Sequence, residues 1–321
     1  MAPIQPNADI ERQQFYDLAA PPKRLGNATY LLVLYCSLMY NPGRGRHAIV
    51  FECHGPHEGI YAMKLYKQDS RDRINREIEV LRHLRSGPNI VQLIDIVQGD
   101  EGANIGVVLE HVDNTDFRTL YPQFSDTDIR YYTRELLQAL EFAHGEGIMH
   151  RDIRPHNVVI DHQNRKLRLI GWSSAEFYQP GGEFELCVGL FKPPELLLCY
   201  ERYDYSMDMW SFGTMLAAMI FRKEPFFHGS SCIDQLLVAA RVLGTESLYH
   251  FVEDYGIQME QEDVETLGHH PRQPWRDLIT SDNQHLATNE AMDLVDRLLQ
   301  FDPRRRLTAS EALAHAYYEV R

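Results

Sequence analysis

Residues 150–173, HRDIRPHNVVIDHQNRKLRLIGWS, contain the most informative pattern of the chain. A carboxylate at Asp152 is followed five residues later by an amide at Asn157. A carboxylate can accept a hydroxyl proton and an amide oxygen can ligate a metal ion, so this spacing favours a catalytic loop. Two apolar runs, 158–160 and 166–170, then flank a polar turn, which predicts a β-hairpin.

The composition is that of an ordinary globular protein. The 321 residues are 44% hydrophobic and 24% charged, enough for one large domain or two modest ones. A net charge of −14 disfavours binding to nucleic acid or to an anionic membrane in bulk. The apolar run at 30–40 is shorter than the ~20 residues that span a bilayer, so we expect a buried strand there.

The cysteines and the N-terminal residues bear on location. Five cysteines without a CxxC spacing argue against a disulfide framework, and we expect their thiols to fill small apolar gaps in a reducing compartment. The first residues lack the basic and apolar segments of a secretory signal. We therefore expect a protein of the cytoplasm, the nucleus or both, with neither a membrane nor nucleic acid as a partner.

Strand-like patterns dominate the first part of the chain. In IYAMKLY, 60–66, the alternation places Ala62 and Lys64 on one face of a strand. Upstream, the segment NPGRG contains Gly43 and Gly45, which would let the backbone approach a phosphate because glycine has no Cβ. An ordinary hairpin turn explains these two glycines equally well.

A helix is predicted over 70–88, where apolar residues recur at helical spacing up to Gly87 and Pro88. Glu77 lies at the edge of the apolar stripe of this helix. A strand lysine and a helix glutamate, here Lys64 and Glu77, can form an ion pair that anchors phosphate groups. Two separately solvated charges are the alternative.

Two further strands are predicted at 91–97 and 105–112, and helical periodicity follows. Ser125 and Asp128 match an S-x-x-D capping box, so we expect a helix to begin there. Its apolar stripe continues to Gly145, directly before the catalytic loop. Residues farther along, YDYSMDMWSFGTMLAAMIF, have the pattern of a large buried helix.

Together these segments resemble a protein kinase, and several are similar to the catalytic alpha subunit of casein kinase II. The resemblance runs from about Arg12 to the C-terminus. It is carried by Trp172 and by the strings IMHRDIRPHNVVIDHQNRKLRLI, EHVDNTDF, SGPNIVQLIDIV, AEFYQPG, IFRKEPFFHG and VLGTESLYHF.

The resemblance implies an α+β, bilobal protein kinase fold. An N-terminal arm at 1–29 would precede a β-rich N-lobe at 30–110 and a hinge and helical C-lobe at 111–321. The family phosphorylates Ser and Thr at acidic sites, uses ATP or GTP with magnesium, and assembles on a dimeric regulatory beta subunit. The resemblance also implies that Glu195, at the end of the activation segment, pairs with the distant Arg306.

The same resemblance assigns roles to individual residues. Asp152 would be the catalytic base, with Arg154 and Lys64 as further catalytic residues, and Asn157 would be the metal ligand. The residues implied to bind the nucleotide are Gly43, Gly45, Val50, Ala62, Lys64, Glu77, Leu109, Glu110, Val112, Asn157 and Ile170.

The chain departs from that family at catalytic positions. Gly171 stands where the family has the metal-binding Asp of its D-W-G tripeptide, and Ser173 stands where it has the Gly. Arg154 replaces the lysine of the catalytic loop and keeps its charge but not its point-like geometry. The first of these changes endangers catalysis.

The segments that recognise acidic substrates are also reduced. The activation segment is shortened after Val188, and of the basic residues expected there only Lys192 remains. The basic run at 67–76, KQDSRDRINR, is diluted by two aspartates.

Two functions therefore compete. Retention of Lys64, Glu77, Asp152 and Asn157 favours an active but slow or unconventional Ser/Thr kinase with protein substrates. Loss of the carboxylate at Gly171, together with the reduced substrate segments, favours a pseudokinase. Such a protein would bind ATP, or GTP, with weak or absent dependence on magnesium. It would act through a beta-type regulatory subunit or a second copy of itself. We favour the pseudokinase because metal-binding and substrate-reading features are lost together.

Overall fold

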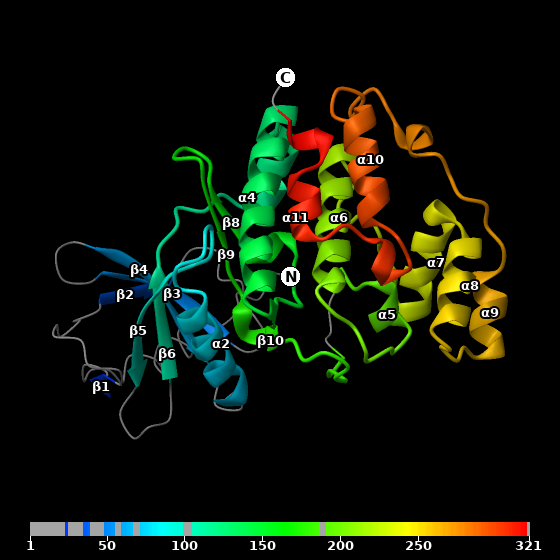
Figure 1. Ribbon diagram of the computed structural model, residues 1–321. Coiled ribbons are helices and arrows are strands. Elements are labelled where there is room, and N and C mark those ends of the chain that lie inside the picture. Colours follow the sequence, from blue (N-terminus) through cyan, green and yellow to red (C-terminus); the bar gives the residue numbers. More distant parts are fainter. Residues whose placement is uncertain are drawn as a thin grey trace, which may run out of the picture. The chain divides into compact units, whose positions relative to one another are not determined.

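The computed structural model describes residues 23–24, 35–38, 48–54, 59–66, 71–98, 105–186 and 191–319. The chain divides into two compact units, one formed by residues 1–85 and 91–111 and the other by residues 86–90 and 112–321. Strands dominate the described part of the first unit and helices that of the second (Figure 1). The α+β fold class predicted from the sequence is therefore confirmed.

The first unit contains an antiparallel sheet with the strand order β1-β5-β6-β4-β3-β2. Its elements are β1 (Lys23–Arg24), β2 (Tyr35–Leu38), β3 (Ala48–His54), β4 (Ile60–Tyr66), α2 (Arg71–His83), β5 (Leu93–Gln98) and β6 (Ile105–Glu110). The strand predicted within 30–40 is present as β2.

The register of this sheet separates two faces. Val50 pairs with Lys64 and Ala62 pairs with Leu109, so these four side chains lie on one face. The opposite face carries a cluster of buried side chains, namely Cys53, Met63, Val97 and Val108. The alternation predicted for β4 is therefore confirmed.

The second unit begins with α3 (Phe117–Leu120) and the long helix α4 (Asp126–Gly145). Short strands and two hairpin strands follow as β7 (Ile148–Met149), β8 (Val158–Asp161), β9 (Lys166–Leu169) and β10 (Glu176–Phe177). The remaining helices are α5 (Pro194–Leu197), α6 (Ser206–Phe221), α7 (Cys232–Leu243), α8 (Thr245–Asp254), α9 (Gln261–Leu267), α10 (Asn289–Leu298) and α11 (Ala309–Leu313).

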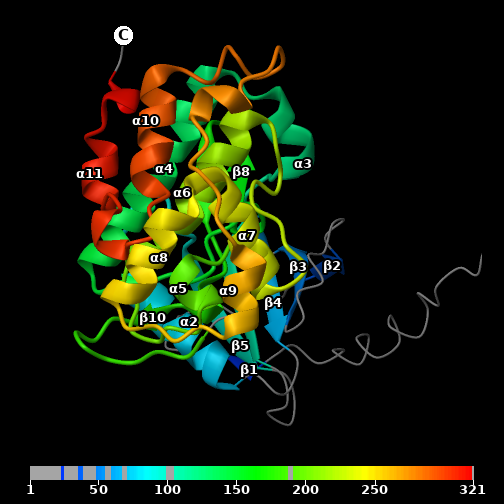
Figure 2. The same cartoon turned by 90° about the vertical axis from the view of Figure 1, so that its right-hand side faces the viewer.

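Two helices form the centre of this unit, and both were predicted. The capping box of α4 is present, because the Ser125 hydroxyl accepts from the Asp128 amide while the Asp128 carboxylate accepts from the Ser125 amide. In α6 every residue after Ser206 is buried, as expected for a helix that is apolar on all sides. A Cβ at Gly213 would lie 2.8 Å from the Leu298 Cβ, so this glycine lets α6 pack closely on α10 (Figures 1 and 2).

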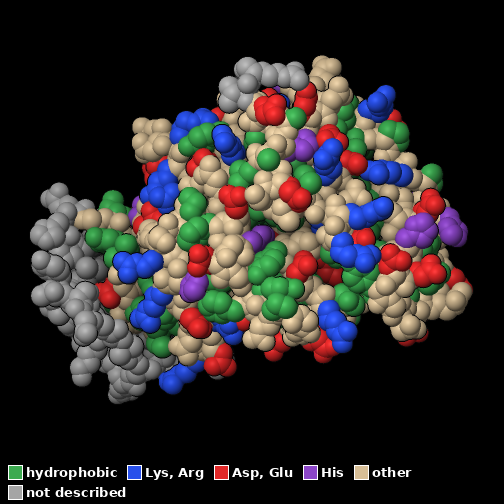
Figure 3. Space-filling view, viewed as in Figure 1, with side chains coloured by type: hydrophobic (Ala, Val, Ile, Leu, Met, Phe, Trp, Pro, Cys, Tyr) green, Lys and Arg blue, Asp and Glu red, His purple; other side chains and the backbone are tan. Residues whose placement is uncertain are grey.

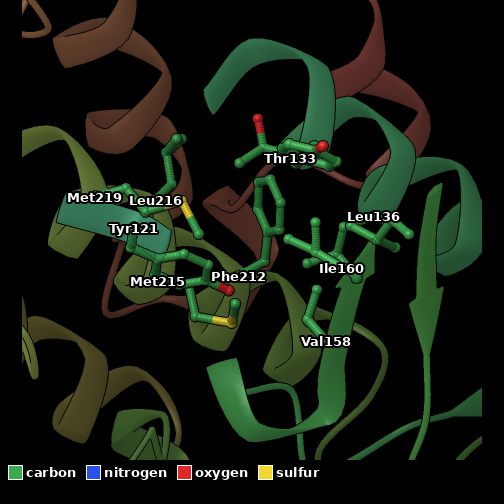
Figure 4. A pocket seen from close by; sticks show the side chains of 11 residues that line it. Tyr121, Thr133, Leu136, Val158, Ile160, Phe212, Met215, Leu216 and Met219 are labelled. Atoms are coloured by element: carbon green, nitrogen blue, oxygen red, sulfur yellow. The ribbon is translucent and has the colours of Figure 1, made fainter. Parts of the chain in front are cut away.

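A small cavity of about 10 Å³ lies in the core of the helical unit. Its lining is apolar and comes from α4, α6, the hairpin β8–β9 and Tyr121, as the labelled side chains in Figure 4 show. A cavity needs at least ~10–15 Å³ to hold one water molecule, so the core is close to fully packed at this point.

Some predictions fail or fall outside the described residues. Cys53 fills an apolar core position as expected, but Cys199 and Cys232 are exposed, so the expectation of buried thiols is wrong for these two. The turn with Gly43 and Gly45 lies outside the described residues, as does the N-terminal arm predicted at 1–29 except for Lys23–Arg24, which form β1 and pair with β5. Within the described part of the chain, no helix has the length and apolar character needed to cross a bilayer.

Candidate functional site

The loop from His150 to Asn157 connects β7 to β8, and its first turn is held by Asp208 of α6. The Asp208 carboxylate accepts hydrogen bonds from the backbone amides of His150 and Arg151, both at 2.8 Å, and contacts the His144 ring at 3.0 Å. Burial raises the pKa of Asp208, but the hydrogen bonds and the nearby histidines outweigh it, so the pKa is lowered overall. The loop is therefore anchored from the core of the unit.

The His150 side chain links this loop to the tripeptide that begins at Gly171. Its Nε2 donates to the carbonyl of Ile170 at 2.9 Å, and its Nδ1 accepts from the amide of Asp152 at 3.2 Å. The imidazole also packs edge-on against Trp172, with ring centroids 4.6 Å apart. Because a carbonyl can only accept, these contacts select the tautomer with the proton on Nε2.

Asp152, the predicted catalytic base, is partly exposed and contacts two other predicted residues. Asn157 Nδ2 donates to the Asp152 carboxylate and to the Asp152 carbonyl, both at 2.7 Å. Arg154 Nε lies 3.7 Å from the other carboxylate oxygen. The structure thus brings together the three residues of this loop to which the sequence assigned catalysis or metal binding.

The guanidinium of Arg118, in α3, contacts this loop at His156. Arg118 Nη2 lies 3.1 Å from His156 Nε2, which must accept because a guanidinium only donates. Burial, followed by the charges of Arg154 and Arg118, lowers the pKa of His156. Carboxylates accompany both guanidinium groups, since Arg118 Nη1 lies 3.5 Å from Asp116 and Arg154 Nε lies 3.7 Å from Asp152.

Gly171 adopts a left-handed conformation, with φ 82° and ψ 40°. A Cβ built at this position would lie 2.4 Å from Asn157 Oδ1 and 2.6 Å from Asn157 Cγ. The Asn157 side chain therefore occupies the space into which any larger residue at position 171 would extend.

This arrangement is a poor fit for magnesium. The ion prefers oxygen ligands that include one or two carboxylates. Within the described part of the chain, the carboxylate in contact with Asn157 is that of Asp152, which is already bound by Asn157 Nδ2 and lies 3.7 Å from Arg154 Nε. Among the described residues, no group of three or more His, Cys, Asp or Glu side chains could hold a metal ion.

In the first unit, Lys64 of β4 and Glu77 of α2 form a buried ion pair. Lys64 Nζ lies 2.9 Å from Glu77 Oε1 and 2.7 Å from Oε2, and the glutamate is 1% exposed. Because α2 carries this glutamate, the helix lies against the Lys64 face of the sheet. Lys64 and Glu77 are therefore not separately solvated charges.

Tyr66, which the sequence reasoning did not single out, shares this site. Its hydroxyl donates to Glu77 Oε2, and its ring centroid lies 4.9 Å from Lys64 Nζ. The i, i+2 spacing of Lys64 and Tyr66 on a strand places both side chains on one face, so strand alternation could have indicated this neighbour.

The other residues implied to bind nucleotide fall into both units. Val50, Ala62 and Leu109 lie on the Lys64 face of the sheet in the first unit. Glu110 ends β6, and its carboxylate accepts from the backbone amide of Gln92 at 3.0 Å, so its side chain is bound to the residue that precedes β5. In the second unit, Val112 is buried, and Ile170 donates its amide to the Asn157 carbonyl at 2.9 Å.

The pair expected between Glu195 and Arg306 is present in the second unit. Both side chains are fully buried, and the guanidinium makes two hydrogen bonds of 2.7 Å to the carboxylate. Arg306 also donates to the carbonyls of Gln300, Ser206 and Phe301.

A comparison with known protein families agrees with this architecture. The family model of the protein kinase domain matches residues 39–318. The matched range includes the ion pair in the sheet unit, the loop with Asp152 and the buried pair at Arg306.

Proposed function

The chain belongs to the protein kinase domain family, and we propose that it is a nucleotide-binding pseudokinase or very weak kinase related to the alpha subunit of casein kinase II. In this proposal it binds ATP, or GTP, with little dependence on magnesium and acts through other proteins. A beta-type regulatory subunit and a second copy of the chain are the partners we propose.

The observation that carries this proposal is the replacement of a carboxylate by Gly171 beside Asn157. Asn157 Oδ1 occupies the place of a side chain at position 171, and Asn157 Nδ2 is bound to Asp152. Loss of one well-placed electrostatic group typically lowers a reaction rate ~10²–10³-fold. A chain without this carboxylate should therefore transfer phosphate poorly.

Nucleotide binding is supported by groups that do not depend on the metal. The Lys64 ammonium is held on the face of the sheet that also carries Val50, Ala62 and Leu109. In the second unit, Arg154 lies beside Asp152 and carries a further positive charge. Apolar side chains on one face and a fixed cation are suited to a base and its phosphates.

The alternative is an active Ser/Thr kinase with unconventional metal use. It is favoured by the complete anchoring of the catalytic loop, since Asp208 holds the backbone of His150 and Arg151. Asp152 would then accept the hydroxyl proton of a protein substrate, and Lys64 and Arg154 would hold the phosphate groups. This candidate requires that positive side chains replace the missing carboxylate's role in orienting the nucleotide.

Two measurements on the purified full chain decide between these functions. A thermal shift with ATP, with and without magnesium, should show stabilisation that changes little with the metal. A phosphotransfer assay, with Asp152→Asn as the control, should show weak activity or none. Phosphorylation at ordinary kinase rates that Asp152→Asn abolishes would overturn the pseudokinase proposal.

A further inference from the structure

The Glu77 carboxylate in the first unit has two side-chain donors. Lys64 Nζ contacts both of its oxygens, and the Tyr66 hydroxyl donates to Oε2. All three side chains are withdrawn from solvent, with exposed fractions of 17% for Lys64 and 1% for Glu77, and Tyr66 at 4%. Water therefore cannot easily replace a donor that leaves.

The two donors come from one strand and the acceptor comes from a helix. Lys64 and Tyr66 stand two residues apart on β4, so both point to the face on which α2 lies. Glu77 is thus bound to β4 by two side chains, the charged Lys64 and the uncharged Tyr66.

The Tyr66 side chain also contacts the lysine directly. Its ring centroid lies 4.9 Å from Lys64 Nζ, within the range of a cation–π interaction. Burial, followed by the charge of Glu77, raises the pKa of Tyr66, so the phenol remains a hydrogen-bond donor at any working pH. Tyr66 therefore contacts both members of the ion pair, Glu77 through its hydroxyl and Lys64 through its ring.

A phosphate group competes with Glu77 for the Lys64 ammonium. If Lys64 were the sole donor to Glu77, its movement toward phosphate would leave the glutamate buried without a hydrogen-bond donor, which is strongly unfavourable. Here the Tyr66 hydroxyl remains on Glu77 Oε2. The lysine can then shift toward a ligand while the helix stays in place.

We propose that Tyr66 is a positioning residue with two roles. Its hydroxyl holds Glu77, and therefore α2, in place independently of Lys64. Its ring positions the Lys64 ammonium to bind nucleotide phosphates. The second part rests on the proposed nucleotide binding. The first part concerns only the sheet unit and holds with or without a ligand.

The test compares Tyr66→Phe with Tyr61→Phe, which removes a hydroxyl from the opposite face of the same strand. Amide hydrogen exchange across residues 71–83 reports on α2 without any ligand. Because a hydrogen bond to a charged group is among the stronger ones, we expect exchange ~5- to 20-fold faster in Tyr66→Phe and unchanged in Tyr61→Phe. Equal exchange in Tyr66→Phe and the unmodified protein would overturn the proposal.

A second comparison tests independence from the lysine. In Lys64→Met, α2 should keep most of its protection because the Tyr66 hydroxyl still holds Glu77. In the double variant Lys64→Met/Tyr66→Phe, the loss of α2 protection from exchange should exceed the sum of the losses in the two single variants. Loss of α2 protection in Lys64→Met alone would show that the tyrosine does not hold the helix.

Isothermal titration with ATP without metal tests the nucleotide part. We expect the Kd to rise ~3- to 10-fold in Tyr66→Phe and to stay unchanged in Tyr61→Phe. A purely structural role would lower the Tm of Tyr66→Phe with an unchanged Kd, which would contradict this part. If the unmodified protein binds no ATP, the proposed function fails, while the exchange experiments still decide the role of Tyr66.

Discussion

A side chain at position 171 would need the space that Asn157 occupies, which affects any attempt to restore a metal site there. A Cβ at position 171 would meet Asn157 Oδ1 at 2.4 Å, and the backbone there has φ 82°. Aspartate tolerates this conformation better than most residues, yet Asn157 would have to turn away and give up its contacts with Asp152. A carboxylate at this position therefore changes the geometry of the whole loop.

We expect Gly171→Asp to strengthen magnesium-dependent ATP binding ~10-fold and to lower the free energy of unfolding by ~1–3 kcal/mol. Combining it with Ser173→Gly should recover some phosphotransfer activity by freeing the backbone beside the new carboxylate, at a further small cost in stability. ATP titrations with and without magnesium, together with urea unfolding, measure both effects. Ser173→Gly alone is the control. A magnesium response equal to that of the unmodified chain would show that position 171 does not contribute to metal binding.

Asp208 makes the stability of the catalytic loop dependent on pH. Its pKa is lowered from the usual 3.8, so the folded state favours the ionised form more than the unfolded state does. The resulting stabilisation is complete well above pH 3.8 and is lost as the pH falls from 3.8 through the lower folded value. Asp208→Asn should flatten this acid limb in a plot of Tm against pH between about 2 and 6. An unchanged acid limb in the variant would assign it to other carboxylates.

Helices and strands with a strong apolar periodicity were predicted correctly, whereas the positions of their ends were predicted less accurately. The apolar stripe of α2 and the alternation of β4 correctly indicate a helix and a strand. The predicted stop at Gly87 and Pro88 lies beyond the last residue of α2, His83, because residues 84–86 form a turn. Helix ends depend on local hydrogen bonds that periodicity does not encode.

The pair Glu195–Arg306 fastens α5, which contains Glu195, to the segment before α11. Both charges are fully buried, so each depends on the other for solvation. Arg306→Met should lower the free energy of unfolding by ~3–5 kcal/mol, because Glu195 would be left buried without its partner. Urea denaturation measures this loss. The double variant Glu195→Gln/Arg306→Met should lose less than Arg306→Met alone, and an equal or larger loss would contradict this explanation.

At the scale of the molecule, motif order predicted the fold class, and residue chemistry at known spacings predicted the ion pair of Lys64 with Glu77. Two features of the sites depend on three-dimensional packing that neither motif order nor residue spacing encodes. One is the position of the Asn157 side chain, which binds Asp152 and fills the space beside Gly171, and the other is the contact of Tyr66 with Glu77, which requires α2 to lie on that face of the sheet. The exposure of Cys199 and Cys232 likewise depends on packing that residue type alone does not determine.

Charge is distributed without a strong local excess on the face seen in Figure 3, where acidic, basic and apolar side chains are interspersed over the helical unit. The net charge is −14, and the first turn of α2 carries an exposed aspartate, Asp72, between exposed Arg71 and Arg73. Recognition of acidic side chains depends on clustered Arg and Lys. We therefore expect a peptide of Glu and Ser to bind weakly and with little dependence on salt.

Fluorescence anisotropy with a labelled Glu/Ser peptide at low and high salt measures this prediction. In the double variant Asp69→Lys/Asp72→Lys, which restores a continuous basic run, affinity should rise by roughly fivefold for each reversed charge and should fall as salt is added. Helix α2 loses a favourable charge in its first turn in this variant, at a cost of only a few tenths of a kcal/mol, so folding should be preserved. Tight, salt-sensitive binding by the unmodified chain would mean that its remaining cations suffice to read acidic sites, and it would support the alternative of an active kinase.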